Sequence, residues 1–173
     1  MNKKQRDRKN RKRAVKVGEM KMNPITYYLT LSQVFPSTHC RAGEPTGFRD
    51  SLRKTKLHTI RANYDFWARR FEKILDGEAV LSIREWVGKP YGKGSTQREI
   101  ARLTRDDGIG LQRLTVAGTS ITTHPIFVDS VAVSSATIAQ NDGLTESDWL
   151  NWFADYKIEG PLAVIQFTKF RYQ

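Results

Sequence analysis

The stretch that decides the fold is residues 48–86, FRDSLRKTKLHTIRANYDFWARRFEKILDGEAVLSIREW. Its central part, 63–76, places aromatic and aliphatic residues on one helical stripe, and Gly77 follows where a helix C-cap is expected. Before this helix, the β-like segment 56–61 (KLHTIR) is short. After it, residues 79–86 alternate between apolar and polar as a half-buried strand does. A helix between two strands predicts a mixed fold.

Working outward, hydrophobic patterning predicts further strands at 25–32, 97–103, 111–116, 126–133 and 162–170. A short helix is expected from Thr46 to Lys54. Another is expected where Thr145 and Asp148 resemble a capping box. Strands with two or three peripheral helices between them predict an α+β fold built on a small, mostly antiparallel β-barrel.

The positive charge is concentrated at one end of the chain. The 173 residues contain 29 Lys plus Arg and 18 Asp plus Glu, a net charge of +11. Residues 1–21 hold ten basic and two acidic residues, so they carry +8 of that charge. We therefore expect a flexible basic arm over 1–21 and a single folded domain over 22–173. The arm would bind the phosphates of RNA or DNA; the alternative is a solvated run of charge.

Several classes of protein are excluded by composition. The single cysteine, Cys40, cannot form an intramolecular disulfide or a CxxC metal site, which is typical of a protein of the reducing cytoplasm. We expect no membrane partner, because the chain lacks a long apolar run. No metal and no cofactor are expected, since the three histidines and the cysteine do not follow metal-ligand spacing.

The KLHTIR segment carries the most reactive groups. In an extended strand, Thr59 and Arg61 share one face with Leu57, whereas Lys56 joins them only if the chain bends before the strand. A desolvated Lys56 beside Arg61 would have a lowered pKa and could act as a general base toward Thr59 or a water molecule. The alternative is an ordinary strand threonine between two solvated cations.

A second candidate region follows the strand at 79–86. Arg84 points outward from that strand, and the loop after it combines aromatic rings with ammonium groups and glycines. Rings and cations together are typical of a clamp for a base and a phosphate. The predicted binding residues are Arg61, Arg84, Trp86, Lys89, Tyr91 and Lys93. The alternative is a mobile hairpin with Trp86 in the core.

The order of these elements resembles the ASCH-domain family. An Arg/Lys-rich helix precedes a K-x-x-T-x-R strand, and a glycine and an alternating strand follow. Near the other end, NDGLTESDWLNWF (141–153) looks like the family's last helix and PLAVIQFTKF (161–170) like its closing strand. The resemblance implies a PUA-like barrel and an ability to bind RNA or nucleotides.

A small bacterial branch of that family hydrolyses the acetyl amide of N-acetylated cytidine with a Lys, a Thr and a Glu. By resemblance these roles fall on Lys56, Thr59 and Asp142, where this chain has Asp in place of Glu. Glu146 is expected to point to solvent. The chain is thus either a module that binds RNA or a nucleotide, or an acyl-amide hydrolase on a modified nucleoside. An adaptor that uses the 63–76 helix is a third class.

Overall fold

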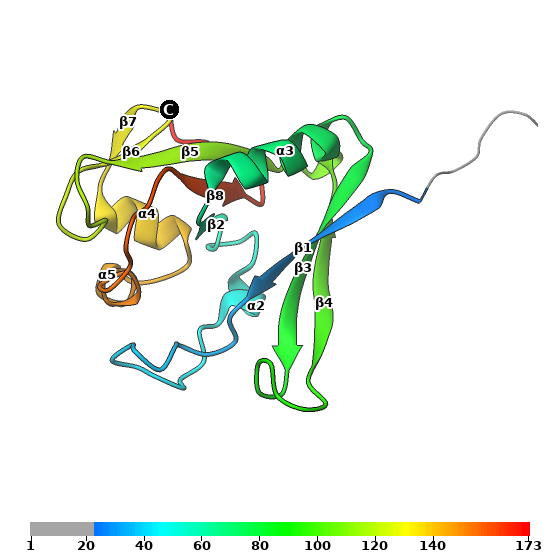
Figure 1. The fold of residues 1–173 in the computed structure, drawn as a ribbon, viewed down its shortest axis with the longest axis horizontal. Coiled ribbons are helices and arrows are strands. Elements are labelled where there is room, and N and C mark those ends of the chain that lie inside the picture. Colours follow the sequence, from blue (N-terminus) through cyan, green and yellow to red (C-terminus); the bar gives the residue numbers. More distant parts are fainter. Residues whose placement is uncertain (1–22) are drawn as a thin grey trace, which may run out of the picture.

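The computed structural model describes residues 23–173, which form a mixed α+β fold of two sheets and four α-helices (Figure 1). The larger sheet has the order β2 (His58–Arg61), β8 (Leu162–Gln166), β5 (Gly110–Val116), β6 (Ile126–Val128) and β7 (Val131–Val133). The smaller has the order β1 (Ile25–Leu31), β3 (Ala79–Val87) and β4 (Thr96–Leu103). The helices are α2 (Phe48–Ser51), α3 (Tyr64–Leu75), α4 (Ser135–Asn141) and α5 (Glu146–Trp152), with a 3-10 turn η1 (Arg105–Asp107).

Most strand pairs are antiparallel, as the sequence predicts. The exception is β1 with β3, which run parallel from the Ile25–Ala79 pair to the Leu31–Glu85 pair. Parallel neighbours need a long crossover, and here the crossover contains α2, β2 and α3. Within residues 23–173 the pairings leave two separate sheets and do not close a barrel.

Strand β8 divides the hydrophobic core into two parts. Ala163 and Ile165 pack in a cluster with α3 and the smaller sheet, whereas Leu162 and Val164 pack in a cluster with α4 and α5. Figure 1 shows α3 on one side of β5 and β8, and α4 and α5 on the other. Because helices cover both faces, β8 is buried along its whole length. It ends at Gln166, four residues earlier than predicted.

Helix α3 confirms the predicted helix over 63–76. The Asn63 side chain accepts a hydrogen bond from the Phe66 backbone N–H at 3.0 Å and so caps the first turn. Trp67, Phe71 and Ile74 are buried under the helix. Phe66 and Leu75, which the stripe also included, lie at its exposed margin.

Three local predictions need correction. Helix α2 is only four residues long and has Gly47, not Thr46, at its N-cap position; the Thr46 hydroxyl donates to the Ser32 carbonyl at 2.7 Å. The predicted strand 126–133 is a tight hairpin of β6 and β7, with Asp129 and Ser130 at positive φ in its two-residue turn. Helix α4 was not predicted, so the helices number four within the described chain, compared with the two or three expected.

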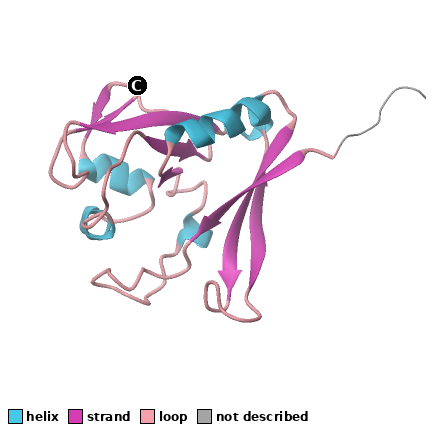
Figure 2. Ribbon diagram, viewed as in Figure 1, coloured by secondary structure: helices cyan, strands magenta, loops and turns pink. Residues whose placement is uncertain are grey.

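The smaller sheet ends in the β3–β4 hairpin loop, at the bottom of the view in Figure 2. The predicted basic arm at 1–21 lies outside the described residues. Among the described residues, no helix is both long enough and apolar enough to cross a bilayer.

Candidate functional site

A cavity of about 540 Å³ opens where β1, α2, β2, α5 and the β3–β4 hairpin meet. Its polar floor consists of Lys56, Thr59, Arg61 and Asp142, and aromatic rings form much of its wall. The floor residues come from two segments about eighty residues apart in the chain. The structure thus brings together the residues predicted from KLHTIR and the predicted acidic residue.

The centre of the floor is a buried ion pair. The Lys56 ammonium donates to the Asp142 carboxylate at 2.6 Å and to the Asp142 backbone carbonyl at 2.7 Å. Lys56 is only 1% exposed and Asp142 5%. The ammonium also lies 3.8 Å from the centre of the Phe48 ring. Burial lowers the pKa of Lys56, and the nearby Asp142 carboxylate acts in the opposite direction.

The chain bends before β2, as the sequence hypothesis required. Lys56 donates its backbone N–H to Ser51 and forms an isolated bridge with Asp142, so it stands outside β2 and turns into the same cavity as Thr59. Gly143 allows the close approach: its φ is +75°, and a Cβ there would lie 2.8 Å from the Lys56 Cβ. The Asp142 carboxylate reaches Lys56 directly, without the additional methylene of a Glu.

Arg61 connects the two sheets at the edge of the cavity. Its guanidinium donates to the Thr59 hydroxyl, to the Ile60 carbonyl and to the Thr30 carbonyl of β1, each at 2.8 Å. The bond to Thr59 confirms that these two side chains share a face of β2. Two of the five guanidinium N–H groups make no hydrogen bond with residues 23–173. These two N–H groups can donate hydrogen bonds to an acceptor in the cavity.

A second layer of polar groups lies behind the floor. Asn141 donates to the Tyr172 hydroxyl at 3.1 Å, and we assign that hydroxyl as the donor to His58 Nε2 at 2.8 Å. The His58 proton then sits on Nδ1, which is 3.9 Å from the Asp142 carboxylate and has no hydrogen-bond partner among residues 23–173. Burial lowers the pKa of His58 to about 4 and keeps the ring neutral. This layer was not identified from sequence.

The aromatic wall combines expected and unexpected residues. Trp86 and Tyr91 line the cavity with their ring centres 4.9 Å apart, as members of the predicted binding set. Trp152, Phe153 and Tyr156 line it from α5 and the segment that follows. None of these three belongs to the predicted binding set, because aromatic residues at the helical spacing of Trp152 and Phe153 are more often part of the core.

Three predicted binding residues lie outside the cavity. Arg84 is on β3 with its guanidinium 4.2 Å from the centre of the Tyr28 ring. Lys89 and Lys93 are exposed in the hairpin loop and do not line the cavity. Glu146 is exposed and accepts a hydrogen bond from Ser135, in agreement with its predicted orientation toward solvent.

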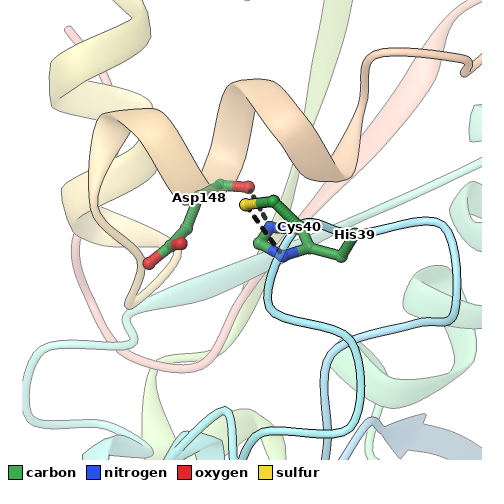
Figure 3. A group of neighbouring side chains, drawn as sticks. All are labelled: His39, Cys40 and Asp148. Carbon is green, nitrogen blue, oxygen red and sulfur yellow. Dashed lines mark hydrogen bonds between the residues drawn. The ribbon is translucent and has the colours of Figure 1, made fainter.

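Another polar group lies outside the cavity, where His39, Cys40 and Asp148 meet (Figure 3). Their potential ligand atoms lie within 4.8 Å of one another. His39 Nε2 is bonded to the Asp148 carbonyl at 2.9 Å, Nδ1 accepts from the Arg41 N–H at 3.0 Å, and the Asp148 carboxylate pairs with the Arg41 guanidinium at 2.8 Å. These atoms already form hydrogen bonds, and the Arg41 guanidinium lies beside them. The group therefore fits a set of contacts that attaches the loop at 39–41 to α5 better than it fits a metal site.

Comparison of the chain with models of known protein families, with curated proteins and with solved structures finds no match in any of the three. The geometry of the cavity is therefore the basis on which function is inferred.

The buried pair predicts that the effects of substituting its two residues are not additive. Lys56→Met and Asp142→Asn each leave one buried group without its partner, so each should lower the free energy of unfolding by about 3–5 kcal/mol. The double variant should lose less than the sum of the two. Urea unfolding of the four proteins measures the coupling. Strict additivity would contradict a direct pair.

The neutral His58 predicts a loss of stability in acid. Its pKa falls from 6.5 to about 4 on folding, so between these values the unfolded chain binds more protons and stability decreases as the pH drops. By pH 4 the contribution is roughly 3 kcal/mol. Thermal unfolding across this window should show a steeper decrease for the wild type than for His58→Gln. Equal slopes would contradict a buried neutral His58.

Proposed function

We propose that the chain is an ASCH-like domain that binds RNA or a nucleotide by receiving a nucleobase in the cavity. The observation that carries the proposal is the combination of aromatic rings with Arg61 and Thr59 around one space of about 540 Å³. Sites for small ligands occupy roughly 300–1,000 Å³, with apolar walls and a few placed polar groups. A base stacks on the rings, and the unused Arg61 N–H groups donate to a carbonyl or phosphate oxygen.

The PUA-like barrel belongs to the same proposal. The Arg61 guanidinium joins the Thr30 carbonyl of β1 to β2, so the two sheets are linked where a barrel would close. This link supports the resemblance to a barrel, although β1 and β2 do not pair with each other as strands.

The state of the floor favours binding over catalysis. Two Lys56 N–H groups are donated to Asp142, and the Thr59 hydroxyl accepts a bond from Arg61. Among residues 23–173, Thr59 makes no hydrogen bond with Lys56 or with another base. A nucleophile and its base normally lie within hydrogen-bond reach. In this arrangement Thr59 orients Arg61, and the floor presents a fixed polar surface to a ligand.

Loss of the stacking ring should weaken binding. We expect Trp86→Ala to lower affinity for a single-stranded RNA oligonucleotide and for mononucleotides by about 1–3 kcal/mol, whereas Trp86→Phe retains much of it. Fluorescence anisotropy for the oligonucleotide and calorimetry for the mononucleotides, at salt high enough to suppress the contribution of residues 1–21, measure this. Phe66→Ala, an exposed aromatic residue of α3, is the matched control. An equal response to both Ala substitutions would place binding elsewhere.

One observation favours a second function, an acyl-amide hydrolase acting on a modified nucleoside. Lys56, Thr59 and Asp142 line the same cavity, and burial lowers the pKa of Lys56 in the direction that a general base requires. In that reaction, neutral Lys56 takes a proton from Thr59 or from a water, which then forms the new C–O bond; where Thr59 is the nucleophile, a water afterwards hydrolyses the acetyl ester and releases acetate. The amide C–N bond breaks, the proton passes through Asp142 to the leaving amine, and Arg61 stabilises the oxyanion.

This second function has a direct assay. Release of acetate from N-acetylated cytidine should be lost in Lys56→Ala and Thr59→Ala, because the groups act as one unit. Asp142→Asn, which keeps the size of the side chain, should lower turnover at least 100-fold. Binding of cytidine by each variant controls for folding. Wild-type turnover equal to that of buffer would exclude this activity and leave nucleobase binding as the function.

A further inference from the structure

The smaller sheet has a second side, opposite the one that packs into the core, and part of it is exposed to solvent. Leu29, Leu31, Leu81 and Ile83 point into the core and are at most 2% exposed. Because side chains alternate along a strand, the residues between them point the other way. We call this side the outer face; along β1 and β3 it carries Thr26, Tyr28, Thr30, Val80, Ser82, Arg84 and Trp86, of which Val80 and Ser82 are buried. Tyr28 is 57% exposed, so its ring is available to a ligand.

Tyr28 and Arg84 form a cation–π pair on the outer face. The Arg84 guanidinium lies 4.2 Å from the centre of the Tyr28 ring, and its Nε donates to the Ser82 hydroxyl at 3.1 Å. Arg84 makes no direct ion pair among the described residues, and the Glu99 carboxylate, which lies opposite it on β4, is paired with Arg102 and accepts a hydrogen bond from Ser82. A guanidinium held over an exposed ring offers a cation to a phosphate beside a flat surface for a base.

The outer face continues into the cavity. Thr30 and Trp86 belong to the outer face by position and also line the cavity. Tyr28 and Arg84 are the next residues on that face, two positions back along each strand, which is about 6.6 Å at about 3.3 Å per residue. Farther along, Arg102 of β4 reaches the Thr26 hydroxyl at 3.4 Å. Rings and guanidinium groups therefore extend from the mouth of the cavity along β1.

We infer that the ligand is a single-stranded nucleic acid, with one base in the cavity and the adjoining nucleotides on the outer face against Tyr28 and Arg84. This inference rests on the proposed function, because it takes the cavity as the site of the first base. A free nucleotide would leave the Tyr28–Arg84 pair unused. A duplex would not expose its bases to the Tyr28 ring, since they are paired and stacked.

The experiment compares ligands of two sizes on the full-length chain. Affinities for a mononucleotide and for a single-stranded RNA oligonucleotide are measured for the wild type, Tyr28→Ala, Arg84→Ala and Trp86→Ala. Tyr28→Phe keeps the ring. Arg113→Ala removes a matched arginine, since Arg113 lies on β5 of the larger sheet, 5.6 Å from the centre of the Tyr64 ring of α3. A single-stranded DNA and an RNA duplex of equal length complete the set.

We expect Tyr28→Ala and Arg84→Ala to weaken oligonucleotide binding roughly 5- to 100-fold and to leave mononucleotide binding unchanged. Tyr28→Phe and Arg113→Ala should change neither affinity. Trp86→Ala should weaken both. Single-stranded DNA should respond to the variants as RNA does, since stacking does not need the 2′-hydroxyl, and the duplex should bind more weakly.

Two results would overturn the inference while the proposed function stands. In the first, Tyr28→Ala and Arg84→Ala leave the affinity for the oligonucleotide unchanged, whereas Trp86→Ala lowers it. In the second, the duplex binds as tightly as the single strand. A wild-type chain that binds neither mononucleotide nor oligonucleotide would overturn the proposed function, and this inference with it.

Discussion

The Lys56 ammonium and the Asp142 carboxylate meet 2.6 Å apart in a region from which water is nearly excluded. A charge buried in this way is tolerated only with a partner and further polar contacts; the Asp142 carbonyl accepts a hydrogen bond from the ammonium, and the Phe48 ring adds a cation–π contact. The pair joins the turn before β2 to the end of α4 and so fixes the position of both. The cavity floor, the bend into KLHTIR and the close approach of Gly143 all depend on this contact.

Arg61 has a comparable role between the sheets. A side chain, not a ladder of backbone bonds, connects the free edge of β1 to β2, because Arg61 donates to the Thr30 carbonyl. A guanidinium suits this position, since its planar array of donors can satisfy protein acceptors and still offer N–H groups to a ligand. The seam between the sheets is consequently also the wall of the cavity.

The elements that sequence reasoning predicted are those that depend on local patterns. Helix α3 follows from its stripe and from Asn63, and the shared face of Thr59 and Arg61 follows from the two-residue period of a strand. The polar floor was predicted in two ways: Lys56, Thr59 and Arg61 from their grouping in KLHTIR, and Asp142 from the family resemblance. Of the aromatic wall, Trp86 and Tyr91 were predicted, but Trp152 was not, since its spacing on the helix is the same for a core residue and for a ligand site. Tyr172 behind His58, and the division into two sheets, depend on contacts between distant segments that no local pattern encodes.

The position of β8 has a consequence for how the chain folds. This strand is inserted between β2 and β5, which precede it by about one hundred and about fifty residues. Until β8 arrives, both neighbours expose unpaired backbone edges, and the two halves of the core have no common wall. Closure of such long loops is slow, and open edges can pair with other chains. The molecule is therefore most susceptible to misassembly in the interval before its central strand is added.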